Sequence, residues 1–63
     1  MNGYERELKK LLSAHGWTFA RHGKGSHEGW SKPGAIPVTV PKDCLSRHLA
    51  NAILKRCGIK HRF

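Results

Sequence analysis

The stretch that decides the fold reads WTFARHGKGSHEGWS, at positions 17–31. Over Trp17–His22 the aromatic side chains of Trp17 and Phe19 alternate with smaller ones, a pattern that is typical of a half-buried strand. Gly23 and Lys24 then offer a two-residue turn into a second strand over about residues 25–31. We therefore expect a β-hairpin in the middle of the chain, covered by the segments on either side of it.

The segment before the hairpin has helical spacing. Its apolar residues recur at intervals of four, three and one, which predicts an amphipathic helix over residues 4–15. Gly16 is expected to end this helix in a left-handed conformation, with Trp17 folding back onto the last turn. The apolar positions are Tyr4, Leu8, Leu11 and Leu12.

The segment after the hairpin predicts a third strand and a second helix. Residues 35–40 alternate, with Ile36, Val38 and Val40 on one face, and Pro37 places this strand at a sheet edge because proline donates no ladder hydrogen bond. Ser46 is expected to cap the second helix, with Leu45 packing against Ala50, and Gly58 to end it before Ile59 folds back. The expected buried stripe of this helix consists of Leu49, Ala52, Ile53 and Cys57.

These elements give the order α-β-β-β-α. We expect one α+β domain spanning residues 1–63, with a three-stranded antiparallel meander and both helices on one face of the sheet. The second strand lies in the centre. The basic tail, residues 60–63, is expected to be mobile.

Composition restricts the function. Twelve Lys and Arg against four Asp and Glu give 63 residues a net charge of +8, which favours a polyanion, with RNA or DNA ahead of an acidic protein. Two cysteines without a Cys-x-x-Cys pair favour a reducing cytosol. The N-terminus is too charged for a signal peptide and no stretch is long enough to span a membrane, so we expect a cytoplasmic protein.

The hairpin register decides where His27 points. With a two-residue loop, Ala20 lies opposite His27, and His27 shares an outward face with His22 while Arg21 points to the helices. A loop one residue longer would reverse this arrangement. From these residues alone, an ordinary exposed histidine and a functional one both remain open.

Several motifs in order resemble the HicA toxins, the ribonuclease halves of bacterial HicA–HicB toxin–antitoxin pairs. They are Gly16-Trp17, Arg21, Lys24-Gly25-Ser26-His27, Val38-Thr39-Val40-Pro41 and ANAILKRCGI at 50–59. The resemblance implies the fold of a double-stranded-RNA-binding domain and an mRNA interferase activity. It also implies a catalytic role for His27 and a HicB-like antitoxin that covers it in a hetero-oligomer. The chain departs from the family where many members carry further histidines, at Glu28 and Lys42.

The chemistry that fits a histidine is attack of the RNA 2′-hydroxyl on the adjacent phosphorus, which needs a base and an acid but no metal. His27 is the expected acid or base, with Gly25 and Ser26 supporting its geometry. The expected RNA contacts are Lys24, Lys32, Arg21 and His22, of which the register favours Lys24, and His22 is the candidate for a second proton carrier. We expect no metal and no cofactor, since the His and Cys spacings match no zinc motif.

Three other functions remain open on sequence grounds. The same charge and fold suit a non-catalytic RNA-binding module, in which His27 only contacts sugar or phosphate. A DNA-binding protein is disfavoured because no recognition helix is evident. A pure protein-interaction subunit is partly contained in the toxin hypothesis, because a toxin must bind its antitoxin; the edge strand and the basic face are the expected docking surfaces.

Overall fold

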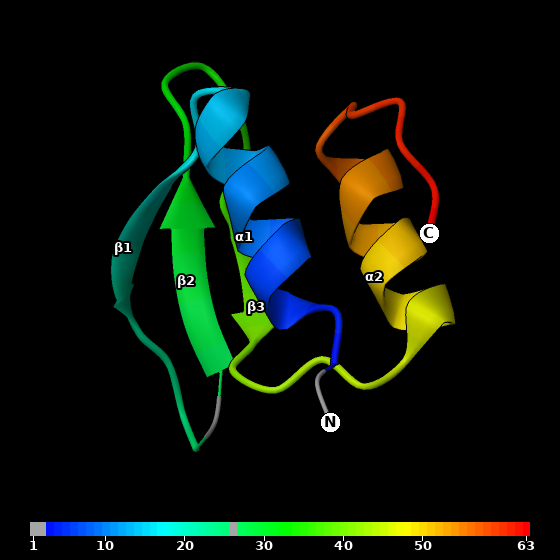
Figure 1. The fold of residues 1–63 in the computed structure, drawn as a ribbon. Helices are drawn as coiled ribbons and strands as arrows, with labels where there is room; N and C mark the ends of the chain where they lie inside the picture. Colours follow the sequence, from blue (N-terminus) through cyan, green and yellow to red (C-terminus); the bar gives the residue numbers. More distant parts are fainter. Residues whose placement is uncertain (1–2, 26) are drawn as a thin grey trace.

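The computed structural model describes residues 3–25 and 27–63 of the chain. Its elements are α1 (Glu5–Ala14), β1 (Thr18–His22), β2 (His27–Ser31), β3 (Val38–Pro41) and α2 (Arg47–Arg56). The strands form one antiparallel sheet in the order β1-β2-β3, so the histidine strand is central (Figure 1). The predicted α-β-β-β-α order and α+β class are confirmed.

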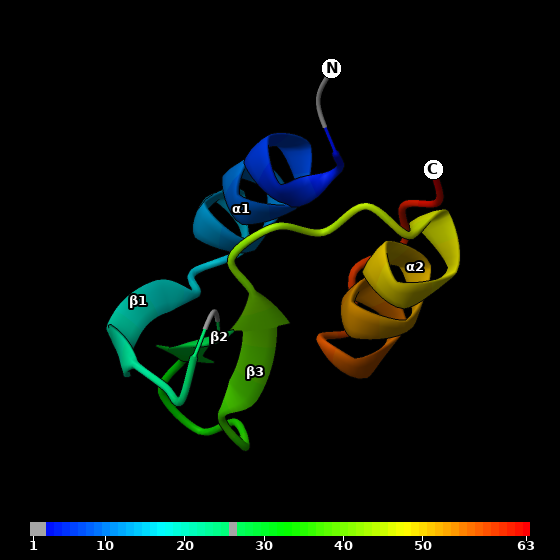
Figure 2. The ribbon, with the colours of Figure 1, turned by 90° about the horizontal axis from the view of Figure 1, so that it is seen from below.

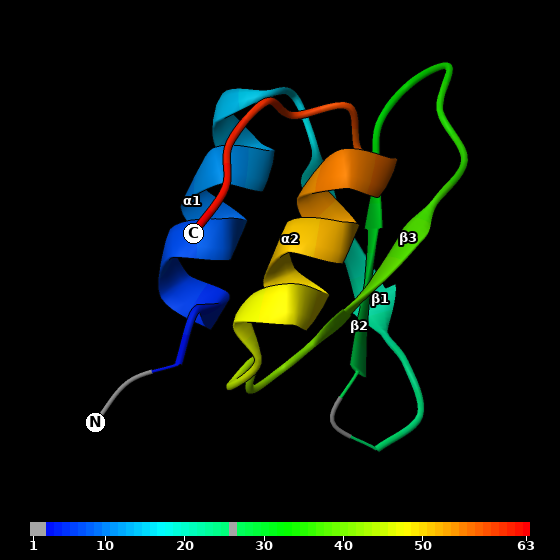
Figure 3. The same cartoon turned by 90° about the vertical axis from the view of Figure 1, so that its right-hand side faces the viewer.

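Both helices lie on one face of the sheet, as the views in Figures 2 and 3 show. We call this the helix-covered face and the opposite one the open face. Glu28 and Trp30 of β2 point to the helix-covered face, where they pair with Val40 and Val38 of β3, and all four are buried. β1 is different, because all five of its residues are exposed and it is held through its pairing with β2.

Each helix ends in the same way. Gly16 and Gly58 have φ of 89° and 74°, the left-handed region that favours glycine. The Trp17 N–H donates to the Leu12 carbonyl at 2.9 Å and the Ile59 N–H to the Leu54 carbonyl at 2.9 Å, so both caps are Schellman motifs. The predicted ends of both helices are confirmed. At the start of α2, the Ser46 hydroxyl accepts the predicted bond from the Leu49 N–H at 3.2 Å.

The buried stripe of α2 was predicted only in part: Ile53 is buried as expected, and Cys57 is partly buried against the core. The helix buries Ala50, Ile53 and Leu54, whereas Leu49 and Ala52 are exposed. Both sets have helical spacing, and contact with β3 and α1 selects between them because only one can face the core. Leu45 is 75% exposed, so it is no buried staple for the helix.

β3 is an edge strand as predicted, but it begins later than expected. Pro37 lies outside the strand, and Ile36, which was expected to share the inner face with Val38, is 85% exposed. Pro41 is the last residue of β3. The edge strand therefore has a proline immediately before it and another as its last residue, and such prolines oppose pairing with a further strand.

The C-terminal segment was predicted to be mobile, but its last residue, Phe63, is packed against Tyr4 and bonded to α2. The Phe63 ring lies 5.0 Å from Tyr4 and 4.9 Å from His61, measured between ring centroids. The Asn51 side chain of α2 accepts a hydrogen bond from the Phe63 N–H at 2.8 Å. These contacts offset the conformational entropy that made the basic tail look mobile.

Cys44 and Cys57 are free thiols, and burial raises the pKa of each. Among the described residues, neither helix has the length and apolar composition to cross a membrane.

Candidate active site on the open face

The β1–β2 hairpin has a different register from the one predicted. Its loop is longer than two residues, because His22 pairs with Glu28 rather than with Gly25. The register also shifts between Phe19 and Arg21, where Ala20 forms a β-bulge. In such a bulge two residues on one strand oppose one on the other, so Ala20 and Arg21 together face Gly29.

The bulge exchanges the faces of Arg21 and His22. Arg21, expected to point to the helices, is paired with Gly29 and lies on the open face. His22, expected beside His27, is paired with the inward-facing Glu28, and its ring lies 5.1 Å from the Phe19 ring. Both orientations were predicted incorrectly, because one extra residue reverses the alternation of every residue after it.

The Arg21 side chain lies over Gly29 of the central strand. A Cβ atom placed on Gly29 would be 3.4 Å from Arg21 Cγ and 3.8 Å from Arg21 Nε. Glycine at position 29 therefore provides the surface over which Arg21 crosses β2. Gly29 is two residues from His27, about 7 Å along the strand and on the same face.

His27 faces outward as predicted, since it is exposed while the next residue, Glu28, is buried. Its ring Nδ1 lies 3.2 Å from the Lys24 carbonyl oxygen. A carbonyl only accepts, so Nδ1 carries the hydrogen, and in the neutral ring the lone pair is on Nε2. The loop thus fixes the tautomer that leaves Nε2 free to take a proton.

The backbone of His27 is contacted by Gly23 of the loop on one side and by β3 on the other. The Gly23 N–H donates to the His27 carbonyl at 2.8 Å, and a Cβ on Gly23 would meet that oxygen at 3.3 Å. Across the sheet His27 pairs with Pro41 of β3. Gly25 has φ of 62° and no atom near its Cβ direction, so glycine is needed there for the turn itself.

Glu28, the residue after His27, is buried on the helix-covered face. Lys9 of α1 lies 3.2 Å from its carboxylate, and the Trp30 indole donates to it at 3.2 Å. Burial raises the pKa of Glu28, but these hydrogen bonds and the Lys9 charge outweigh burial and hold it below its ordinary value. The residue after His27 therefore joins α1 to β2 and takes no part in the open face.

The other predicted site residues are only partly brought together. Lys24 belongs to the loop that hydrogen-bonds His27, and it is exposed. Lys32 follows the far end of β2 and lies near Gly16, away from His27. The prediction for Ser26 falls outside the described residues. Gly29 was not among the predicted site residues, although a glycine in the middle of a central strand is typical of close approach by another group.

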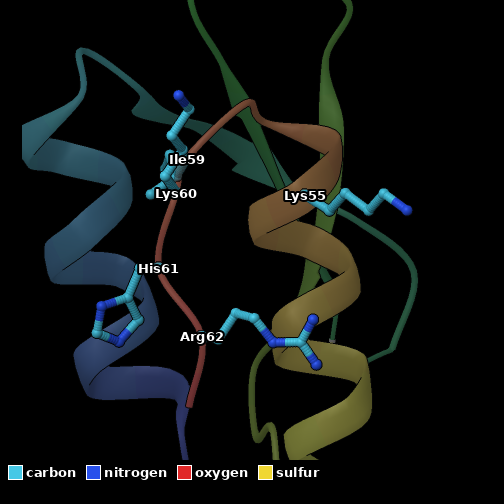
Figure 4. A pocket seen from close by; sticks show the side chains of 5 residues that line it. All are labelled: Lys55, Ile59, Lys60, His61 and Arg62. Atoms are coloured by element: carbon cyan, nitrogen blue, oxygen red, sulfur yellow. The ribbon is translucent and has the colours of Figure 1, made fainter.

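Cavity volume does not mark this site. A cavity of about 340 Å³ lies between α2 and the C-terminal segment, lined by Lys55, Ile59, Lys60, His61 and Arg62 (Figure 4). It contains none of the predicted site residues, and the charged ends of its side chains point in different directions in Figure 4. His27 instead lies on an exposed surface, which suits a polymeric substrate. Within residues 3–25 and 27–63, no three His, Cys, Asp or Glu side chains are grouped as a metal site would require.

Both the sequence and the fold of this chain are similar to those of known proteins. The family model for the HicA toxin of bacterial toxin–antitoxin systems matches residues 6–59. A chain of the solved toxin–antitoxin complex from Streptococcus pneumoniae is 40% identical, with a TM-score of 0.78 over 87% of this chain and 95% of that one. No curated protein matches the sequence. The chain belongs to the HicA toxin family.

Proposed function

We propose that this chain is an endoribonuclease toxin that binds and cleaves mRNA without a metal ion, and that His27 carries the chemistry. The observation that supports this most directly is the oriented imidazole. Its Nδ1 is hydrogen-bonded to the Lys24 carbonyl and the residue is exposed, so Nε2 can approach a ribose hydroxyl.

The reaction is an internal transfer of the phosphoryl group. Nε2 of His27 accepts the proton of the 2′-hydroxyl as the O2′–P bond forms, and the P–O5′ bond breaks with a proton passing from water to O5′. The products are a 2′,3′-cyclic phosphate and a 5′-hydroxyl end. The negative charge that develops on the phosphoryl oxygens needs a cation on the open face, and Arg21 is the one whose placement supports this role.

The proposed partner is a HicB-like antitoxin that covers the open face and buries His27 in a hetero-oligomer. A solved relative comes from a toxin–antitoxin complex. A chain of net charge +8 is suited to an acidic partner that competes with RNA for the same surface. Because its substrate is mRNA, the toxin would act in the cytoplasm of a bacterial or archaeal cell.

The test is cleavage of a labelled mRNA in excess EDTA by the wild-type protein, His27→Ala and His15→Ala. His15 is a matched control because it is also an exposed histidine, but it lies outside the sheet, at the C-terminal end of α1. There its ring Nδ1 is hydrogen-bonded to the Leu11 carbonyl oxygen. We expect cleavage by the wild type and His15→Ala, and at least a 10²-fold loss in His27→Ala. Equal cleavage by His27→Ala would contradict the proposal. RNA binding without cleavage by the wild type would favour the non-catalytic module.

A further inference from the structure

On the open face, Gly29 is a residue that by itself lowers the stability of its strand. Glycine in the interior of a strand loses more conformational entropy than other residues and packs no side chain. Gly29 is the middle residue of β2, which is the central strand of a small sheet. Valine or isoleucine at this position would strengthen the strand.

The structure offers a reason for glycine in the placement of Arg21. An alanine Cβ at position 29 would touch Arg21 Cγ at 3.4 Å, an ordinary contact. A β-branched side chain would extend further in the same direction, into the space that the arginine occupies. Gly29 thus determines whether Arg21 can lie across β2.

The β-bulge at Ala20 also contributes to placing Arg21 on the open face. Without it, regular pairing from Phe19–Trp30 would set Arg21 opposite Glu28, where the two would form an ion pair on the helix-covered face. With the bulge, Lys9 is the ion-pair partner of Glu28 and Arg21 reaches the face of His27. Two separate features, a bulge and a glycine, place the same guanidinium on the open face.

We propose that Gly29 is a positioning residue: by leaving the surface of β2 free, it lets Arg21 present its guanidinium beside His27 to the scissile phosphate. This rests on the proposed ribonuclease function. Guanidinium binds two phosphate oxygens at once in a fixed geometry, which a displaced arginine no longer does.

The experiment compares five variants with the wild type: Gly29→Ala, Gly29→Val, Arg21→Ala, the double variant Arg21→Ala with Gly29→Val, and Ser31→Val. Ser31→Val is the matched control because it adds a β-branched side chain to the same face of the same strand, but opposite Thr18 rather than Arg21. Cleavage, thermal midpoint and binding to a 2′-O-methyl RNA, which cannot be cut, are measured for each.

We expect Gly29→Val and Arg21→Ala each to lower cleavage about 10²-fold, and the double variant to be no worse than Arg21→Ala. Gly29→Ala should lose much less, and Ser31→Val should cleave like the wild type. The midpoint of Gly29→Val should be no lower than that of the wild type, because valine favours the strand. A purely structural role for Gly29 would predict a lower midpoint and additive losses.

Binding gives a second, independent readout. Loss of one phosphate contact should reduce the slope of log affinity against log salt by about 0.7 for single-stranded RNA, in both Gly29→Val and Arg21→Ala. The inference is overturned if Gly29→Val cleaves and binds like Ser31→Val, or if it lowers cleavage equally in the Arg21→Ala background. Those results are distinct from failure of the proposed function, in which His27→Ala cleaves like the wild type.

Discussion

The two faces of β2 differ in how they are filled. On the helix-covered face, Glu28 and Trp30 are buried and joined by a hydrogen bond, and Lys9 ties them to α1. On the open face, His27 is exposed and Gly29 has no side chain. The side chain that lies over Gly29 is that of Arg21, from β1. Alternating residues of a single strand thus separate stability from the proposed chemistry.

This difference shows how a 63-residue domain can hold a site without weakening its core. A small core contributes only a few kcal/mol of net stability, so each buried position matters. Placing the proposed site on the opposite face avoids competition with that core. The loss of stability then falls on open-face positions such as Gly29, where glycine weakens the strand, and not on the core.

The largest effect is expected from Trp30→Ala, which attacks the helix-covered face directly. Removing a buried tryptophan costs about 3–5 kcal/mol, comparable with the whole stability of so small a domain. We expect the variant to be largely unfolded by circular dichroism at 25 °C, whereas His27→Ala keeps the wild-type spectrum. A folded Trp30→Ala protein would break the distinction between the two faces.

Glu28→Gln should lower the free energy of unfolding by about 1–2 kcal/mol at pH 7, because the amide keeps an acceptor for Trp30 but loses the charge that pairs with Lys9. The pKa of Glu28 is lowered in the folded state. Its contribution is therefore complete above the ordinary value of 4.5 and is lost as pH falls through the folded value.

Urea unfolding from pH 7 to pH 2 checks this expectation. The stability difference between the wild type and Glu28→Gln should shrink toward the acid end of that range. A constant difference at all pH values would show that the carboxylate charge is not what stabilises the folded state. His27→Asn is a suitable control from the open face, because it removes no buried contact.

The two core tryptophans provide a smaller and sharper comparison. The Trp30 indole N–H donates to Glu28, whereas the buried Trp17 indole N–H has no partner among the described residues. Phenylalanine removes the N–H and a similar volume from each. We therefore expect Trp30→Phe to cost about 1 kcal/mol more than Trp17→Phe in chemical denaturation, although Trp17 is the more buried. Equal costs would mean that the Glu28 bond contributes little.

The smallest effect is expected from His22→Ala, because His22 points away from His27. Cleavage should change by less than about threefold and stability by less than about 0.5 kcal/mol. Its neighbour Arg21 lies on the open face, so adjacent residues are predicted to differ widely in their effect on cleavage. A loss in His22→Ala as large as that in His27→Ala would restore His22 as a second proton carrier.

Local features of the sequence were sufficient for the elements and their order. Helix spacing, the glycines at 16 and 58 and the Ser46 cap each act within one or two turns of chain, and all were confirmed. The meander order agreed with the edge position that Pro37 predicted. His27 faces outward as expected, although the two-residue loop on which that expectation rested is not the loop observed. The roles proposed for His27, Gly25, Ser26 and Lys24 remain predictions.

Only the tertiary structure determined how the elements meet. The Ala20 bulge exchanged the faces of Arg21 and His22, and the core selected Ala50 rather than Leu49 as the buried side of α2. The C-terminal segment became ordered through contacts with Tyr4 and Asn51, which lie far from it in the chain. Propensity and spacing act between near neighbours, so the sequence determined each element. Register and face depend on which of several equally regular arrangements best fills the space between elements, and that is decided only when the elements pack.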